Sequence, residues 1–84
     1  MRAFIIVTVK KDSPQLNYDM ELPTNTRVGK LAQDIREALI AYRPSLAETL
    51  PLCRLYSERR GEVLAGDRTL AELGIRTGDI LELQ

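Results

Sequence analysis

The sequence predicts an α+β fold in which one amphipathic helix packs on a mixed sheet of four to five strands. Three observations carry this prediction. Residues 3–9 and 16–22 read as two strands joined by a short polar loop, residues 28–42 repeat apolar side chains at helical spacing, and residues 52–83 return to short alternating segments between turns. The expected element order is β-β-α-β-β-β, and residues 1–84 are expected to form a single domain.

The first two strands are indicated by different signals. Residues 3–9 are rich in β-branched side chains, whereas residues 16–22 alternate apolar and polar side chains. This alternation directs Leu16, Tyr18, Met20 and Leu22 inward. The polar residues 10–15 between them suit a hairpin loop longer than the tightest turns.

The helix is expected to begin after Pro23, with Thr26 as its N-cap. Gly29 in its first turn costs roughly 1 kcal/mol relative to alanine, which suggests a close approach of the helix to the sheet. Arg43 and Pro44 end the helix, because a residue before proline avoids helical angles. The apolar face comprises Val28, Leu31, Ala32, Ile35, Ala38, Leu39 and Tyr42.

Residues 44–64 are expected to hold one helical turn and two strands. Ser45 and Glu48 have the spacing of a capping box between two prolines, so a single helical turn is predicted there. Residues 52–58 alternate as a strand. The Arg60-Gly61 pair then turns the chain into a short strand around Val63 and Leu64.

The C-terminal segment 64–83 carries the most specific pattern. Thr69 and Glu72 form a second capping-box spacing, which would direct Leu70 and Leu73 inward. Gly74 lies where a helical turn needs a left-handed residue to stop. Gly78-Asp79 is a turn before a last strand that alternates through Leu81 and Leu83.

These elements and residues resemble ubiquitin-like β-grasp proteins over nearly the whole chain. The ending Leu-Gly-Ile-x-x-Gly-Asp-x-Leu-x-Leu and the length are most similar to the bacterial YukD/EsaB-like group of small ubiquitin-like proteins. The resemblance implies a cytosolic component of a type VII (WXG100) secretion system that is not conjugated to targets. It rests on Leu64, Gly66, Thr69, Leu70, Leu73, Gly74, Ile75, Gly78, Asp79, Leu81 and Leu83.

Composition excludes several classes of function. The 84 residues are 44% hydrophobic and 29% charged, as expected of a soluble folded domain, and twelve basic residues balance twelve acidic ones. Without net charge, binding to nucleic acid is not expected. The longest apolar run, residues 3–7, is too short for a signal peptide or a membrane span, so we expect a cytoplasmic protein without direct membrane insertion.

Neither catalysis nor a bound cofactor is expected. The chain has no histidine, and its one cysteine, Cys53, can form neither an internal disulfide nor a zinc site by itself. Cys53 is interpreted as a small inward hydrophobe, with a reactive or regulatory thiol as the alternative. Asp34 and Glu37 could form a carboxylate pair, but a solvated helix face explains them more simply. The glycines form no phosphate-binding motif.

The outward side of the sheet is the candidate binding site. Alternation places Phe4, Ile6, Leu52, Tyr56 and Ile80 outside, where they would form an apolar patch with Arg54 and Glu82 at its rim. In a β-grasp sheet the first strand lies beside the fifth, and the fifth beside the third. The alternatives are that residues 44–51 cover part of this face, or that these side chains only favour strand structure.

Three functions fit this sequence, beside a stand-alone regulator of an unrelated enzyme, for or against which no residue argues. The first is a non-enzymatic interaction module whose sheet face binds a protein of the secretion machinery, or a second copy of itself as a homodimer. The second is the soluble N-terminal domain of a larger secretion-channel membrane protein. The third is a truncated sulfur carrier or modifier, disfavoured because the chain reaches Gln84 without a diglycine tail.

Overall fold

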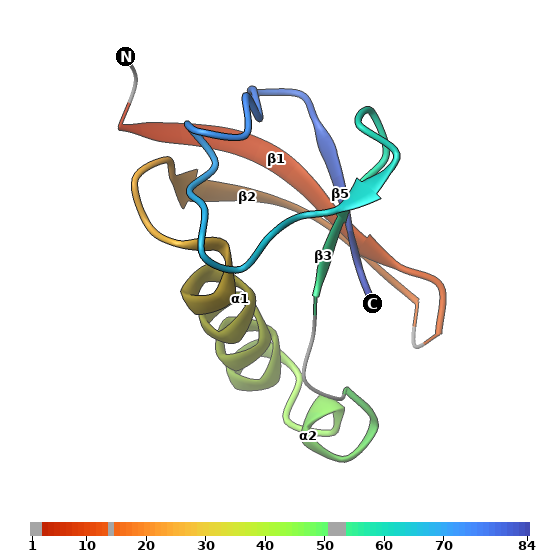
Figure 1. Cartoon of the computed structure of the whole chain (residues 1–84). Coiled ribbons are helices and arrows are strands. Elements are labelled where there is room, and N and C mark those ends of the chain that lie inside the picture. Colours follow the sequence, from red (N-terminus) through yellow and green to blue (C-terminus); the bar gives the residue numbers. More distant parts are fainter. Residues whose placement is uncertain (1–2, 14, 51–53) are drawn as a thin grey trace.

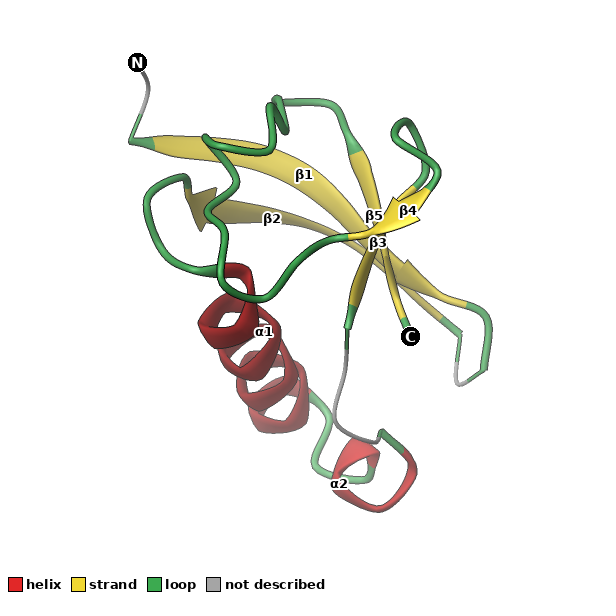
Figure 2. Cartoon of the chain, viewed as in Figure 1, coloured by secondary structure: helices red, strands yellow, loops and turns green. Residues whose placement is uncertain are grey.

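A five-stranded sheet and one long helix make up the fold, with strand order β2-β1-β5-β3-β4 (Figures 1 and 2). The computed structural model describes residues 3–13, 15–50 and 54–84. Strands β1 and β5 run parallel, and every other neighbouring pair is antiparallel. The elements are β1 (Phe4–Lys11), β2 (Leu16–Pro23), α1 (Val28–Tyr42), α2 (Leu46–Thr49), β3 (Leu55–Ser57), β4 (Glu62–Val63) and β5 (Ile80–Leu83). The predicted element order and the mixed sheet are confirmed.

The β1–β2 hairpin provides half of the core. Its register places Ile5 opposite Leu22 and Val7 opposite Met20, so the apolar side chains of both strands share the face toward α1. Val7 and Val9 are almost fully buried. The predicted facing of both strands is therefore confirmed.

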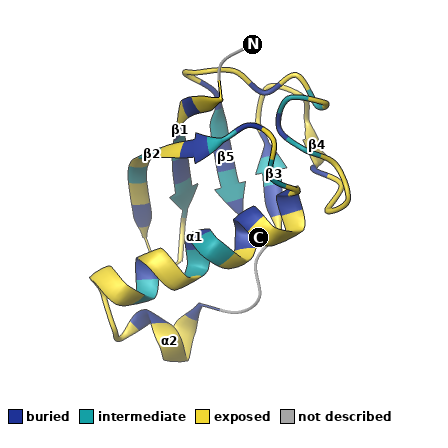
Figure 3. Cartoon of the chain, turned by 90° about the vertical axis from the view of Figure 1, so that its left-hand side faces the viewer, coloured by how far each residue is buried: buried dark blue, intermediate teal, exposed yellow. Residues whose placement is uncertain are grey.

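Helix α1 packs its apolar face on this side of the sheet (Figure 3). The buried side chains follow the predicted period and are Val28, Leu31, Ala32, Ile35 and Leu39. Ala38 and Tyr42, assigned to the same face, are exposed instead. Both lie beside β2, which is an edge strand of the sheet, so no further strand of the described residues covers them.

The start of α1 differs from the prediction. Arg27, not Thr26, is the N-cap, and no side chain caps the helix. Instead the amides of Val28 and Gly29 donate to the carbonyl oxygens of Arg68 (2.8 Å) and Gly66 (3.0 Å). A Cβ at Gly29 would lie 3.3 Å from the Gly66 oxygen. The close approach indicated by Gly29 is therefore to the loop at Gly66 and not to the sheet.

Only one of the two capping-box patterns forms. The Glu72 amide donates to Thr69 Oγ1 (3.2 Å), and the Thr69 amide donates to Glu72 Oε1 (3.0 Å). Ser45 precedes the predicted helical turn, α2, but its side chain makes no capping bond. Ser45 has helical angles, with φ −61° and ψ −20°, whereas an N-cap side chain reaches the amides from an extended backbone.

Strand β3 is shorter than predicted, and β4 is displaced by one residue from its predicted position. β3 covers three residues of the predicted 52–58, and Leu52 and Cys53 lie outside the described residues. β4 is Glu62–Val63, and the Leu64 amide continues the cross-strand bonding by donating to the Leu55 oxygen (2.8 Å). The turn at Gly61 is confirmed by its φ of 66°.

The two capping patterns predict different effects of the same kind of substitution. Thr69→Ala should lower the free energy of unfolding by about 1 kcal/mol, because it removes the hydroxyl that accepts from Glu72. The matched control, Ser45→Ala, should change it by less than about 0.5 kcal/mol. Urea unfolding followed by circular dichroism measures both. Equal losses in the two variants would contradict this assignment.

Candidate interaction face of the sheet

The sheet surface turned away from α1, here called the outer face, carries the predicted site residues. Phe4 and Ile6 project from β1 with 54% and 50% of their surface exposed. Ile80 and Tyr56 are half-buried on β5 and β3, and Arg54 is exposed just before β3. Glu82 lies opposite Tyr56. Leu52 lies outside the described residues, so its predicted place on this face stays a prediction.

The register between β1, β5 and β3 shows which of these residues are neighbours. Ile80 pairs with Thr8, which places it diagonally next to Ile6. Tyr56 pairs with Glu82 and so lies diagonally next to Ile80. The outward residues of β1, β5 and β3 therefore form one diagonal band, as the strand order predicted.

The band is crossed by a charged pair that the sequence analysis missed. Lys10 Nζ lies 2.6 Å from Glu58 Oε2, and this ion pair spans β5 between Ile80 and Glu82. The hydrogen bond and charge of Glu58 raise the pKa of Lys10, so Lys10 stays protonated at neutral pH. Alternation along strands could not reveal this pair, because it joins a side chain of β1 to one just after β3, and β1 and β3 are not neighbours in the sheet.

The outer face therefore has two apolar areas and not one continuous patch. One comprises Phe4, Ile6 and Ile80. The other comprises Tyr56 and Val63, which pair across β3 and β4, and Val63 is 42% exposed. Val63 was not among the predicted site residues, although its apolar side chain two residues after the Gly61 turn was the available signal.

Residues 44–50 do not account for the half-buried side chains of this face. Leu46 and Leu50 belong to the core on the helix side, and Arg36 Nε donates to the Leu50 oxygen (2.8 Å). Figure 3 shows α2 beneath α1. The alternative that this segment covers the outer face is therefore not supported within the described residues.

The position of β5 is set by a buried carboxylate. Asp79 is only 9% exposed and accepts two hydrogen bonds from Arg59, at 2.9 Å and 2.8 Å. Its Oδ2 also accepts from the Arg76 amide (3.0 Å), and Arg59 reaches the Gly74 oxygen (2.7 Å). The pKa of Asp79 is lowered, and the side-chain hydrogen bonds from Arg59 are the main cause. We call this arrangement the Arg59–Asp79 clasp.

The turn held by the clasp is bonded directly to β1. The Gly78 amide donates to the Ile6 oxygen (2.9 Å), and the Thr8 amide donates to the Asp79 oxygen (3.0 Å). Ile6 and Ile80 consequently have fixed positions relative to each other on the outer face.

The other sequence candidates have structural explanations. Asp34 is ion-paired with Lys30 at 2.6 Å and Glu37 is exposed, which agrees with a solvated helix face. Gly74 and Gly78 have φ of 70° and 94°, as turn residues require. Cys53 lies outside the described residues. The described residues bring together no group of three His, Cys, Asp or Glu suited to hold a metal ion.

Comparisons with known proteins agree on fold and family. The model of the family described as WXG100 protein secretion system (Wss), protein YukD, matches residues 4–83. No curated protein sequence matches significantly. In residues 3–13, 15–50 and 54–84, no helix combines the length and apolar character needed to cross a membrane.

Several similar solved structures are described as ubiquitin-like domains. The EccD5 ubiquitin-like domain from Mycobacterium xenopi has a TM-score of 0.73 at 15% identity, over 99% of this chain and 94% of that one. A chain of the MycP5-free ESX-5 inner membrane complex has a TM-score of 0.76 at 18% identity. The match covers 99% of this chain and 21% of that one. The N-terminal ubiquitin-like domain of the 4931431F19Rik protein has a TM-score of 0.71 at 21% identity. The match covers 100% of this chain and 76% of that one. These likenesses show the fold.

The Arg59–Asp79 clasp predicts a specific acid sensitivity. The pKa of Asp79 is lower in the folded chain than its unfolded value of about 4, so the clasp stabilises the fold fully above that pH. This stabilisation is lost as the pH falls through the folded-state pKa. Asp79→Asn should be less stable at pH 7 and should lose less stability between about pH 5 and 2.

Urea unfolding across this pH range measures the effect. The control Asp67→Asn, at an exposed loop carboxylate, should keep the original stability at pH 7. An Asp79→Asn variant whose acid profile matches that of the unchanged chain would contradict the role given to the clasp.

Proposed function

Because the chain belongs to the YukD family of WXG100 protein secretion systems, we propose that it acts as a non-enzymatic accessory component of such a system in the cytoplasm. Its role is to bind another protein of the machinery. The family match over residues 4–83 is the observation that carries this proposal.

The proposed contact is the outer face. It offers two exposed large apolar side chains, Phe4 and Ile6, and a second apolar area at Tyr56 and Val63. The Lys10–Glu58 pair between them, with Arg54 and Glu82, supplies polar groups that can fix the orientation of a partner. Exposed apolar surface with a polar rim is typical of protein-binding sites.

Gln84 is held in the sheet by the residue that precedes β3. Gln84 exchanges two backbone hydrogen bonds with Arg54, at 2.8 Å and 2.9 Å, and so continues the sheet beyond β5. A conjugated modifier or a sulfur carrier needs a projecting tail that ends in diglycine. A diglycine encoded just beyond Gln84 would favour that alternative.

A second candidate is the N-terminal ubiquitin-like domain of a larger membrane protein. The likeness to one chain of the ESX-5 inner membrane complex, of which this chain spans 21%, favours it. Hydrophobic spans encoded downstream of Gln84 would identify this variant. The outer face would serve the same role in both cases.

The outer face predicts which substitutions abolish binding. Ile6→Asp and Tyr56→Asp each place a charge in one apolar area, so each should weaken partner binding by about 2 kcal/mol or more. Affinity purification of tagged chain from the host, with secreted WXG100 substrate measured in the medium, tests this. Circular dichroism checks that the fold is kept.

Ala47→Asp is the matched control, because Ala47 is an exposed apolar residue on α2, away from the outer face. It should purify with the same secretion-machinery proteins as the unchanged chain. Undiminished binding by both Ile6→Asp and Tyr56→Asp would reject the outer face as the contact.

The same face is a candidate for self-association. With no net charge there is no long-range repulsion between copies, so a homodimer through Phe4 and Ile6 is expected at high concentration. Sedimentation velocity over a concentration series measures it. In that series Ile6→Asp should stay monomeric, and a dimer that survives this change would place the contact elsewhere.

A further inference from the structure

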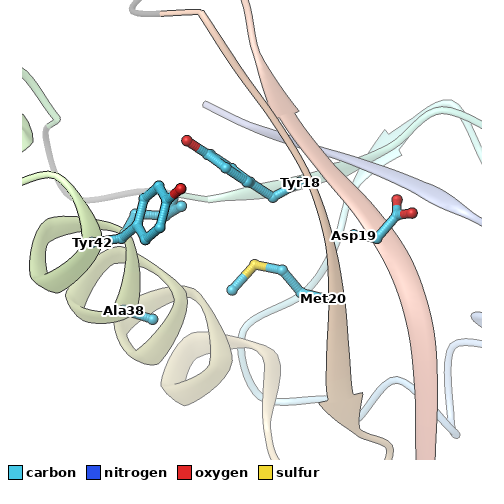
Figure 4. Close-up of a pocket in the computed structure, with 6 residues that line it drawn as sticks. Tyr18, Asp19, Met20, Ala38 and Tyr42 are labelled. Atoms are coloured by element: carbon cyan, nitrogen blue, oxygen red, sulfur yellow. The ribbon is translucent and has the colours of Figure 1, made fainter.

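A second surface, separate from the outer face, runs between β2 and α1. Two adjoining cavities of about 300 Å³ and 210 Å³ share Met20 and Ala38 as lining residues. Figure 4 shows Tyr18 and Met20 pointing from β2 toward α1, where Ala38 and Tyr42 lie opposite. The rings of Tyr18 and Tyr42 meet edge to face at 5.6 Å. We call this surface the edge groove.

The groove lies along an unpaired sheet edge. β2 is the last strand of the sheet, and within the described residues no strand pairs with its far side. The main-chain groups of Ile6 and Thr8 bond toward residues 78 and 79, so their β2 partners, Glu21 and Asp19, direct their own amides and carbonyls to the open edge. These groups form a template for another strand.

The cavities have the spacing of a strand. One lies at Tyr18 and Met20, and the next at Met20 and Leu22, so they follow each other by two residues along β2. Side chains two residues apart in an added strand would lie about 6.6–6.8 Å apart on the same face. Two alternate side chains of such a strand therefore reach the two cavities, whose walls include Ala38, Leu31 and Ile35.

The charges on the groove have one sign. Asp19, Glu21 and Asp34 are the ionisable acids that line the two cavities, and the described lining residues include no lysine or arginine. Asp34 is engaged by Lys30 and Asp19 by the Thr8 hydroxyl, but Glu21 has no ion-pair partner among the described residues. Residues of an added strand that face outward would lie opposite Asp19 and Glu21, where basic side chains are favoured.

From these observations we propose that the edge groove binds an extended segment of another protein in which apolar and basic residues alternate. The segment adds to the sheet beside β2, places its apolar side chains in the two cavities and its basic side chains opposite Asp19 and Glu21. A second copy of this chain is a poor occupant. Antiparallel pairing of two β2 strands would set Asp19 opposite Asp19 or Glu21, and like charges in that position repel.

A synthetic peptide provides the test. The probe is an acetylated, amidated heptapeptide of lysines alternating with valine and isoleucine (KVKIKVK). When it is titrated into the ¹⁵N-labelled full chain, the peptide should shift the amide resonances of Asn17, Asp19 and Glu21. Its affinity should fall as salt is added. A peptide with glutamate in place of each lysine should cause no such shifts. A scrambled peptide with the lysines together should bind at least about threefold more weakly.

Two variants and a matched control locate the contact. Ala38 is exposed and lines both cavities, so Ala38→Leu should fill them and weaken peptide binding by about tenfold. Ala41→Leu, on the same helix but outside both cavities, should bind as the unchanged chain does. Glu21→Lys should weaken binding by about three- to tenfold. Circular dichroism and the dispersed amide spectrum verify that each variant is folded.

Three outcomes would overturn the proposal. The first is that the lysine peptide leaves the resonances of residues 17–21 unmoved at millimolar concentration. The second is equal binding of the lysine and glutamate peptides. The third is a concentration-dependent shift of the same amides in the Ile6→Asp variant without peptide, which would identify a second copy as the occupant. None of these bears on the outer face, which the Ile6→Asp variant tests separately.

Discussion

The Arg59–Asp79 clasp is the constraint on which the arrangement of the sheet depends. A carboxylate that is 9% exposed is stabilised by two hydrogen bonds from one guanidinium and one from the Arg76 amide. Paired, charge-assisted bonds of this kind fix geometry as well as charge. They join the turn after β3 to the turn before β5, so the last strand enters between β1 and β3 in a single register. Without that register the side chains of the outer face would not adjoin.

The segment between β4 and β5 has a second structural role at the other end of the molecule. Its carbonyl groups at Gly66 and Arg68 accept from the first amides of α1, and the absence of a Cβ at Gly29 leaves room for the backbones to approach. The capped turn at Thr69 and Glu72 then directs Leu70 into the core. One loop thus connects the start of the helix to the start of the last strand. A small domain with a modest core depends on such backbone contacts.

The two candidate contact surfaces differ in chemistry. The outer face combines apolar side chains with an ion pair of balanced charge, Lys10 and Glu58. The edge groove combines an apolar floor, open main-chain groups and acidic side chains of one sign. The cavities of the edge groove lie on the helix side of the β1–β2 hairpin, whereas Glu21 lies opposite Ile6, so the two surfaces adjoin along this pair of strands. The chain has no net charge, so partner choice depends on these local patterns and not on an overall field.

The sequence by itself determined the elements and their facing, because alternation and helical period report directly which side of a strand or helix is apolar. The burial of Leu81 and Leu83, the turn at Gly74 and the Thr69 capping box follow from such local signals. Tertiary structure alone decided how α1 is capped, because main-chain groups some forty residues away accept from its first amides. It also decided that the Ser45 capping box does not form, because Ser45 has helical backbone angles. Tertiary structure likewise decided the Lys10–Glu58 pair and the edge groove, because both require knowing which strands are neighbours and that β2 is paired on one side only within the described residues.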